Sequence, residues 1–477
     1  MISTRGTIVT RAFRPAVLAL VVLALAGACS AAAPVPPEPV PAPEPAGLSP
    51  LRVDGRFLTD GSGAPFFWTG DTAWALPALL DREETAHYLD TRAEQGFNVV
   101  QMVALFPQAG ADGPNRYGDR PYRGGLDDLA VTDGADPSDP EAYDYWDHLD
   151  TVVAMAAERG IRIGLLPVWA DEQVGELVTE DNARGYGEFV GDRYGDRVVW
   201  ILGGDESADG VEQVWRELAA GIETGAGRDV LITYHPIGDR SSADWFADDP
   251  WLDLNMVQGG HCLRHDVRRR VIDATYRADP TKPFLDGEPI YEDHPYCWEK
   301  PPEGYSTALD VRRDAYWSVF AGALGHTYGH HAVWQFSTPD RPAALGARGN
   351  WREALRAPAG RQMTHLRALM ESRPFTTGEP APDVVTDTGD GAERIQATRA
   401  RDGAYLMAYV PDGRAFEVDL GALSGPARAW WFDPRTGRAT PETVGDGRVT
   451  VTPPDDQDWV LVADDATRGF PAPGAPS

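Results

Sequence analysis

Between residues 51 and 373 the chain alternates short apolar runs with longer amphipathic stretches. Several apolar runs are continuous and rich in valine, isoleucine and leucine, as expected for strands that are covered on both faces. Eight strands are predicted, at 66–68, 98–104, 161–167, 198–202, 230–234, 254–258, 283–286 and, for the last one, Thr327 with 332–335. Helices are predicted between them at 82–95, 142–159, 186–194, 211–223, 265–277 and 307–324.

Eight strand–helix repeats predict an α/β fold, a (β/α)8 TIM barrel with insertions over residues 51–373. Acidic residues at helix starts and glycines near helix ends, such as Gly96 and Gly160, support the element limits. An open, doubly wound sheet is the main competing architecture. It is disfavoured because no glycine-rich phosphate-binding loop follows the first strand.

The region 374–465 has a different pattern, with short apolar runs separated by turn residues such as Pro411-Asp412-Gly413. These runs lie at 404–410, 416–420, 427–432, 448–451 and 459–462. Such spacing predicts a small antiparallel β-sandwich as a second domain. The last residues, 466–477, are predicted to be a disordered tail.

The first residues, 1–29, have the pattern of an export signal. A cationic start is followed by the apolar run Ala16 to Ala26, which is shorter than the roughly 20 residues needed to span a bilayer. The run ends in Ala26-Gly27-Ala28-Cys29, which resembles a bacterial lipobox with Cys29 as the lipidated residue. A small-residue cleavage site with an incidental cysteine is the alternative. Residues 30–50 follow as a proline- and alanine-rich linker, so the chain is predicted to be exported, either extracellular or a cell-surface lipoprotein.

The charge of the chain excludes some partners. Lysine and arginine total 43 and aspartate and glutamate total 73, which gives a net charge of −30. Such a surface repels nucleic-acid phosphates and anionic lipid headgroups, so nucleic acid is not a predicted partner, and membrane contact is expected only through the lipid anchor. The 15 tryptophans and 42% hydrophobic content can fill a sizeable core.

Barrel enzymes place their chemistry at the carboxyl ends of the strands, where this sequence collects acids, histidines and tryptophans. These residues are Asp71 and Trp74 after the first strand, Gln108, Trp169, Asp205 with Glu206, His235, His261 and Glu288 after the next six, and Tyr328 and Trp334 around the eighth. Hydrolysis of a glycosidic bond needs this mixture, because two carboxylates act on the bond and aromatic faces hold the sugar. Carbohydrate is therefore the predicted partner, and no cofactor is predicted.

Asp205 and Glu288 are the candidate catalytic pair. Asp205 follows Gly203-Gly204, which leaves room for a ligand near the backbone, and Glu288 follows Asp286-Gly287 after a buried strand. Either acid could instead be a loop cap or a member of a salt bridge. Glu206, the next residue, is the competing candidate for the role of Asp205. The alternation of side chains along a strand does not by itself decide which of the two acids faces the pocket.

Four motifs carry a family resemblance: 69–74 (TGDTAW), 200–206 (WILGGDE), 286–289 (DGEP) and 325–329 (GHTYG). They resemble the apiosidase-like catalytic family over roughly residues 51–373, and 429–437 (AWWFDPRTG) looks like the collagen-binding-like domain that often follows such barrels. The resemblance implies a glycosidase acting on branched plant-pectin sugars. It also implies an aspartate acid/base after strand four and a glutamate nucleophile after strand seven, which fall on Asp205 and Glu288. Nothing in the acidic sandwich suggests collagen, so packing or glycan contact is the favoured role.

Several of the remaining candidates have two interpretations. Asp71 and Trp74 are candidates to hold a sugar hydroxyl and ring, although Asp71 could cap the following helix. His235 and His261 line the site or are only hydrogen-bonding neighbours, and Trp334 lines the pocket or belongs to the core. A metal is not predicted at 326–331, because the spacing of the histidines there has no helical meaning in a strand and loop.

Two cysteines, Cys262 and Cys297, remain beyond the lipobox. In an exported chain they predict one disulfide, since they follow neighbouring strands of the barrel. A metal pair and two free buried thiols are the alternatives.

The combined hypothesis is a retaining glycoside hydrolase with no metal. A non-catalytic carbohydrate-binding lipoprotein and an adhesin acting through residues 374–465 are the rival hypotheses.

Overall fold

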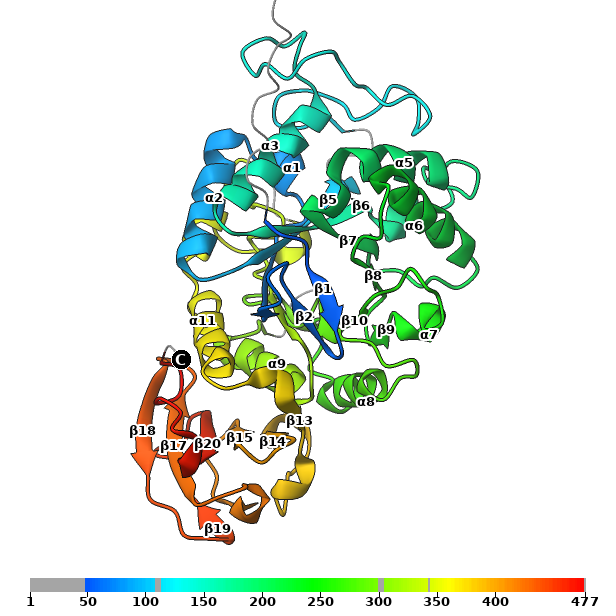
Figure 1. Ribbon diagram of the computed structural model, residues 1–477. Coiled ribbons are helices and arrows are strands. Elements are labelled where there is room, and N and C mark those ends of the chain that lie inside the picture. Colours follow the sequence, from blue (N-terminus) through cyan, green and yellow to red (C-terminus); the bar gives the residue numbers. More distant parts are fainter. Residues whose placement is uncertain (1–47, 108–112, 299–303, 342–343, 476–477) are drawn as a thin grey trace, which may run out of the picture. The chain divides into compact units, whose positions relative to one another are not determined.

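A computed structural model describes residues 48–107, 113–298, 304–341 and 344–475 (Figure 1). It shows a barrel of parallel strands surrounded by helices, followed by antiparallel strands at the carboxyl end, which confirms the predicted fold class. The export signal, Cys29, most of the linker and Gln108 lie outside the described residues. Among the residues described, no helix is both long enough and apolar enough to span a bilayer.

Eight parallel strands form the barrel wall. They are β4 (Trp68–Thr72), β5 (Val99–Leu105), β6 (Arg162–Val168), β7 (Val198–Gly203), β8 (Ile232–His235), β10 (Asn255–Gln258), β11 (Phe284–Asp286) and β12 (Gly325–Tyr328). They are hydrogen-bonded in the order β8-β7-β6-β5-β4-β12-β11-β10, and the short β9 (Arg240–Ser241) pairs antiparallel with β10. Between β8 and β10, Asp253 N–H donates to Ile232 O at 2.9 Å and the Thr233 hydroxyl donates to Leu254 O at 2.8 Å. These two bonds bridge the remaining gap in the ring.

Helices cover the outside of the barrel. They are α1 (Leu76–Leu79), α2 (Arg82–Glu94), α3 (Tyr145–Glu158), α4 (Ala170–Gln173), α5 (Ala183–Tyr194), α6 (Glu212–Ala226), α7 (Ala243–Phe246), α8 (His265–Tyr276), α9 (Ala308–Phe320), α10 (Trp351–Ala354) and α11 (Pro358–Glu371). Capping boxes at Asp81, Asp144 and Thr307 fix the starts of α2, α3 and α9, because each side chain accepts a bond from an otherwise unpaired backbone N–H.

The first and eighth strands differ from the prediction. β4 extends to Thr72, so Asp71 lies inside the strand, and β12 ends at Tyr328, so 332–335 form no strand. Instead, Val333 N–H donates to His330 O and Phe336 N–H to Val333 O, which makes successive turns. The prediction was wrong there because a buried loop satisfies the same apolar pattern as a buried strand.

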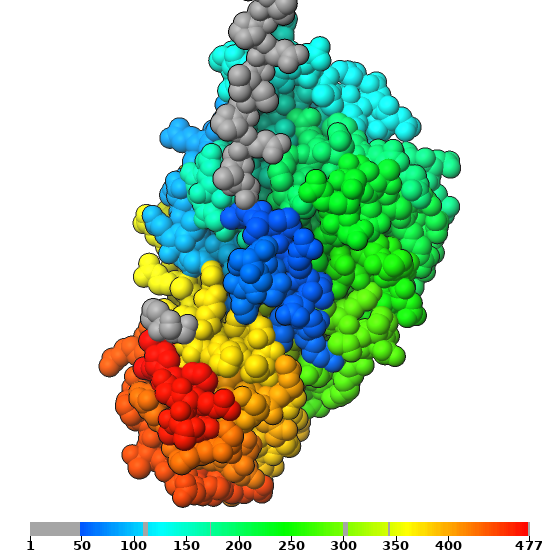
Figure 2. Space-filling view, in the orientation of Figure 1, coloured from blue at the N-terminus to red at the C-terminus, as the bar shows by residue number. Residues whose placement is uncertain are grey.

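The amino-terminal strands β1 (Arg52–Asp54), β2 (Phe57–Thr59) and β3 (Pro65–Phe66) form a separate small sheet. This blue segment lies on the face seen in Figure 2. Arg162 Nη2, at the start of β6, donates to Ser49 O at 2.6 Å. A hollow of about 440 Å³ lies beside Leu51, Val198 and Val230 at these amino-terminal strand ends, opposite the end where barrel chemistry is expected.

The carboxyl-terminal domain contains two antiparallel sheets. One contains β13 (Gly378–Pro380), β14 (Gln396–Ala400), β15 (Tyr405–Val410), β17 (Ala427–Asp433), β18 (Arg438–Glu442) and β20 (Trp459–Asp465), and the other contains β16 (Phe416–Asp419) and β19 (Arg448–Val451). Residues 466–477 were predicted to be a disordered tail, but residues 466–475 pack on the folded domain. Phe470 lies under the Arg373 guanidinium, 5.1 Å from ring centroid to carbon, and Gly474 N–H donates to the Ser372 hydroxyl, which together hold the segment on the folded surface.

Candidate active site

The turn after β7 has an unusual backbone. Gly203, Gly204 and Asp205 all have positive φ angles, of 85°, 124° and 56°. A side chain at position 203 would lie 2.3 Å from His235 O, and one at 204 would lie 2.8 Å from the Trp169 ring. Only glycine fits at these two positions, and the strained conformation of Asp205 that follows is typical of functional sites.

The Asp205 carboxyl group is held from two sides. Its Oδ1 accepts a hydrogen bond from Gln258 Nε2 at 2.8 Å, and its backbone N–H lies 3.3 Å from His235 Nδ1. Burial and the negative charge of Glu288 raise the pKa of Asp205 to about 6, against the lowering effect of Gln258. The group therefore remains protonated in mildly acidic solution.

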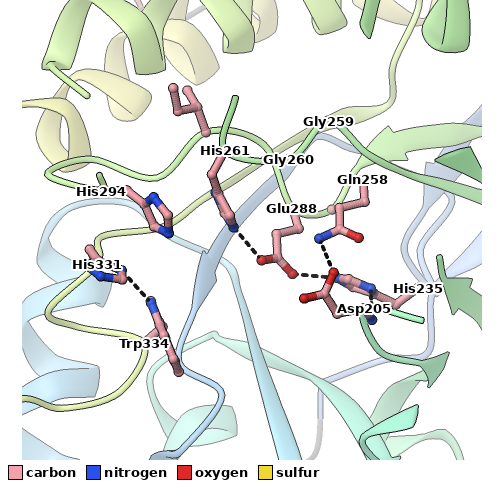
Figure 3. Close-up of polar contacts among 12 residues, drawn as sticks. Asp205, His235, Gln258, Gly259, Gly260, His261, Glu288, His294, His331 and Trp334 are labelled. Carbon is pink, nitrogen blue, oxygen red and sulfur yellow. Dashed lines mark hydrogen bonds and ion pairs between the residues drawn. The ribbon is translucent and has the colours of Figure 1, made fainter. Parts of the chain in front are cut away.

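Glu288 lies between two histidines (Figure 3). Its Oε2 is 2.8 Å from His235 Nε2, and its Oε1 is 2.9 Å from His261 Nε2. Burial alone would raise the pKa of Glu288, but the hydrogen bonds and charges of both histidines outweigh burial and lower it to about 2. Glu288 is thus ionised where Asp205 is protonated, and such divergent pKa values are how acid/base roles are assigned in carboxylate pairs.

The barrel interior fixes the backbone before Glu288. Gln101, on β5, donates from Nε2 to Gly287 O at 3.0 Å. Thr327 bonds to Gln101 in turn, and Trp68 Nε1 donates to the Thr327 hydroxyl at 3.0 Å. This chain of buried hydrogen bonds fixes the position of Glu288 from the interior of the barrel.

Tryptophans flank the Asp205 side of the site. The ring centroids of Trp74 and Trp169 lie 5.1 Å apart, and each is 5.6 Å from the centroid of His235. Trp74 is buried, whereas Trp169 is half-buried and can offer its face to a sugar.

A row of histidines flanks the Glu288 side. The His294 ring lies 4.1 Å from His261 and 4.2 Å from His331, measured between centroids, and Trp298 packs across the row at 4.0 Å from His294. Trp334 Nε1 donates to His331 Nδ1 at 3.2 Å. Burial and the neighbouring histidines lower the pKa of His294, so this ring is neutral and packs without charge repulsion.

Two of the predicted substrate-binding residues lie elsewhere. Asp71 is fully buried, forms an ion pair with Arg92 of α2 at 2.6 Å and bonds to Tyr88. Tyr328 pairs with Asp71 in register and donates to Glu292 Oε2 at 2.8 Å. Both side chains lie between the barrel and the helices, so the prediction that they contact substrate is wrong.

Glu206 makes a different contact from Asp205. Its Oε1 accepts a hydrogen bond from Ser207 N–H at 2.7 Å, which makes its carboxylate a local cap of the loop. The two neighbouring acids therefore differ: the charge of Glu288 acts on the Asp205 carboxyl group, whereas the Glu206 carboxylate bonds to its own loop.

Gln258, Tyr291, His294 and Trp298 were not among the predicted site residues. Gln258 follows an apolar run and could have been found by the same rule as Asp205. The others come from the long segment after β11, where no strand or helix pattern indicates which side chains turn back to the site. Tyr291 is fully buried, and burial together with the charge of Glu288 raises its pKa far above the usual range.

The structure contains the predicted disulfide between Cys262 and Cys297, with 4.5 Å between the Cα atoms. Cys297 N–H also donates to His261 O at 3.0 Å, so the bridge ties the Trp298 segment to the loop that carries His261.

Replacing both Cys262 and Cys297 with serine is expected to lower stability and activity together. The bond closes a loop of 35 residues, worth about 3 to 4 kcal/mol in the chain-entropy model. The midpoint temperature of unfolding should fall because the cross-link is lost. The kcat should fall because the freed segment carries Trp298. An unchanged midpoint and unchanged kcat would contradict this role, and reduction of the wild-type protein is the matched control.

Among the described residues, no group of three or more histidine, cysteine or acidic side chains could hold a metal ion. The histidines of the row stack face to face or edge to face and do not converge on a point.

Two solved structures that resemble this chain are glycoside hydrolases. A solved structure described as a glycoside hydrolase is 34% identical, with a TM-score of 0.80, and the match covers 88% of this chain and 97% of that one. A family 5 glycoside hydrolase from Bacteroides vulgatus is 35% identical, with the same TM-score, 88% of this chain and 93% of its own covered. The fold and these matches define a glycoside hydrolase.

The family follows from the sequence match. Residues 52–377 match the model described as "Apiosidase-like, catalytic domain", and residues 380–464 match "Putative collagen-binding domain of a collagenase". The chain belongs to the apiosidase-like family. No curated protein matches it.

Proposed function

We propose that the protein is a retaining glycosidase in which Glu288 is the nucleophile and Asp205 the acid/base. The observation that carries the proposal is the opposed environment of the two acids. Two histidines hydrogen-bonded to Glu288 keep it ionised, while burial beside that charge raises the pKa of Asp205 to about 6, so that Asp205 is protonated in mildly acidic solution. A retaining enzyme needs one acid in each of these states at the start of the reaction.

Each step then has a named donor and acceptor. A Glu288 oxygen attacks the anomeric carbon, the glycosidic C–O bond breaks, and the Asp205 proton passes to the leaving oxygen. Water next attacks the anomeric carbon of the glycosyl–enzyme ester and gives its proton to Asp205, and the ester bond breaks to restore Glu288. His235 and His261 hold the attacking carboxylate and stabilise its charge between turnovers.

The proposed substrate is a sugar side chain of a plant-pectin polysaccharide or an oligosaccharide from it. The apiosidase-like family match and the tryptophans on either side of the carboxylates support this class. A screen of purified protein against pectic, arabinan and galactan oligosaccharides, with mass-spectrometric product analysis, would identify the sugar.

Export and anchoring at the cell surface through Cys29 belong to the same proposal. The Cys262–Cys297 disulfide supports an oxidising compartment, since such bonds are rare in the cytosol. Radiolabelled palmitate incorporation that is lost in the Cys29→Ser variant would test the anchor.

Stereochemistry is the direct test of the mechanism. Carboxyl groups of retaining enzymes lie about 5 to 5.5 Å apart, whereas inverting enzymes need about 6.5 to 9.5 Å for a water. We expect this shorter separation between the carboxyl groups of Asp205 and Glu288. Proton NMR of the first turnovers should show a product of unchanged anomeric configuration, and an inverted product would exclude Glu288 as nucleophile.

A further inference from the structure

A buried ion pair lies behind the catalytic glutamate. Arg268 of α8 pairs with Asp314 of α9, and their side chains are only 2% and 1% exposed. Arg268 Nη2 also donates to three backbone carbonyls, Gly259 O at 3.0 Å, Gly260 O at 2.9 Å and Cys262 O at 3.2 Å. One guanidinium thus organises the whole loop 259–262, and Asp314 fixes the guanidinium.

The loop 259–262 holds Glu288 through both backbone and side chain. Gly260 N–H donates to Glu288 O at 2.9 Å, and His261 in the same loop lies 2.9 Å from Glu288 Oε1. Gly259 N–H donates to Asp286 Oδ1 at 3.0 Å. A displacement of Arg268 would therefore move the nucleophile and remove one of the two histidines that keep its pKa low.

The next polar contact of α9 is with the carboxyl-terminal sandwich, which lies beside it (Figure 1). Arg312, two residues before Asp314, forms a bidentate pair with Asp458, with both N···O distances 2.7 Å. Tyr316 stacks on Tyr409 at 4.8 Å between centroids, and Trp317 Nε1 donates to Arg394 O at 2.8 Å. Helix α9 therefore contacts Arg268, which organises the loop 259–262, on one side and the sandwich on the other.

A second ion pair joins the two domains without this connection. Arg373, just after α11, forms a bidentate pair with Asp464 at 2.8 and 2.7 Å. Asp458 and Asp464 are both buried and belong to the same end of the chain, but only Asp458 contacts the helix that carries Asp314. The protein therefore contains its own matched control.

We propose that the sandwich is a working part of the catalytic centre: by holding α9 it sets Asp314 and Arg268, which position the loop 259–262 and with it Glu288. Arg268 and Asp314 are positioning residues, since neither reaches the substrate. This inference rests on the proposed role of Glu288. It assigns the sandwich a role in the chemistry of the barrel that requires no ligand of its own.

The size of the effect follows from the chemistry of buried pairs. Removing one partner of such a pair leaves an uncompensated charge, and the surrounding structure moves to solvate it. Without Asp458, Arg312 would keep its hydrogen bond to Gln362 Oε1 of α11 at 2.7 Å but lose its charge partner, and α9 would be free to shift relative to Arg268. A displacement of the nucleophile by about 1 Å is sufficient to reduce turnover by about 100-fold.

The test compares Asp458→Asn with Asp464→Asn in the full chain. Both should lower the unfolding temperature, but only Asp458→Asn should accelerate hydrogen exchange in peptides covering 257–263 and 287–291, by about tenfold. Its kcat should fall by more than its KM rises. The acidic limb of its pH profile should move to higher pH, because the pKa of Glu288 rises as His261 is displaced. Asp464→Asn should leave the acidic limb of the pH profile and the hydrogen exchange of these peptides unchanged.

Milder variants cover a failure of Asp458→Asn to fold. Arg312→Lys keeps the charge but cannot make the bidentate pair, and Tyr409→Phe removes only the hydroxyl that donates to Asp458 Oδ2 at 3.1 Å. Both should accelerate the same peptides to a smaller extent. Equal effects of the Asp458 and Asp464 variants, or exchange changes confined to the sandwich, would overturn the inference.

The exchange measurement separates this inference from the proposed function. It reports on the loop whether or not a substrate is known. If the wild-type protein cleaves no glycoside but the exchange pattern holds, the proposed function fails and the coupling of the sandwich to the loop stands. If the wild-type protein is active and the Asp458 variants match it in exchange, kcat and pH profile, only the coupling fails.

Discussion

Glu288→Gln is expected to lower kcat by about 10⁴-fold or more, because the amide cannot form the covalent bond to the anomeric carbon. The side chain keeps its shape and can still bond to His235 and His261, so folding should be little changed. The pKa of His235, which hydrogen bonding to Glu288 raises against the effect of burial, should fall in this variant. NMR titration of the histidine ring protons would detect that change without any substrate.

Glu292→Gln is the matched control for that substitution. Glu292 is a buried glutamate four residues further along, but its carboxylate accepts from Tyr328 Oη at 2.8 Å and from Ala359 N–H at 3.1 Å, outside the site. This variant should lose stability and keep most of its kcat. Full activity of Glu288→Gln, or equal loss in both variants, would remove Glu288 from the mechanism.

The barrel and its two acids could be predicted because each depends on local sequence. A buried run of β-branched and aliphatic residues marks a parallel strand, and the polar residue that follows it lies at the reactive end. Asp205 and Glu288 each satisfied this rule, and the two glycines before Asp205 recorded the tight backbone that the structure shows.

The errors at Asp71 and Tyr328 came from the limits of the strands. The barrel strand β4 begins at Trp68, two residues later than predicted, so Asp71 lies within the strand with its side chain toward α2. Tyr328 is its register partner on β12 and therefore shares its face. A three-residue apolar run gives few side chains to fix the limits of a strand, so Asp71 was expected beyond the end of the strand instead of inside it.

The histidine row could not be predicted for a different reason. His261, His294 and His331 come from three loops and meet only because the disulfide and the turns after β12 bring those loops together. No spacing along the chain records this meeting. His331 was weighed from the sequence only as a metal ligand, which its spacing disfavoured, whereas its ring contact with His294 gives it a packing role.

Asp205→Asn is the second substitution with a large expected effect, and its signature is selective. Asparagine tolerates positive φ, so the backbone at 205 should be retained. Substrates with a sugar leaving group need the proton from Asp205 and should lose about 10²- to 10⁴-fold in rate. A dinitrophenyl glycoside, whose leaving group needs no proton, should form the glycosyl–enzyme normally and then stall, giving a burst of phenolate. Glu206→Gln should show neither effect, and the reverse outcome would transfer the role to Glu206.

The pH profile gives an independent measure of the same group. The reactive form has Asp205 protonated and Glu288 ionised, so kcat/KM in the wild-type protein should fall as pH rises through about 6, where Asp205 loses its proton. The acidic limb lies near pH 2, where Glu288 gains one, so the optimum falls between these values. Because the two carboxyl groups interact, the two apparent pKa values of the profile are properties of the pair. In Asp205→Asn the basic limb should disappear, because the group that titrates there is gone, while the acidic limb should move only slightly. A basic limb that persists in this variant would mean that another residue supplies the proton.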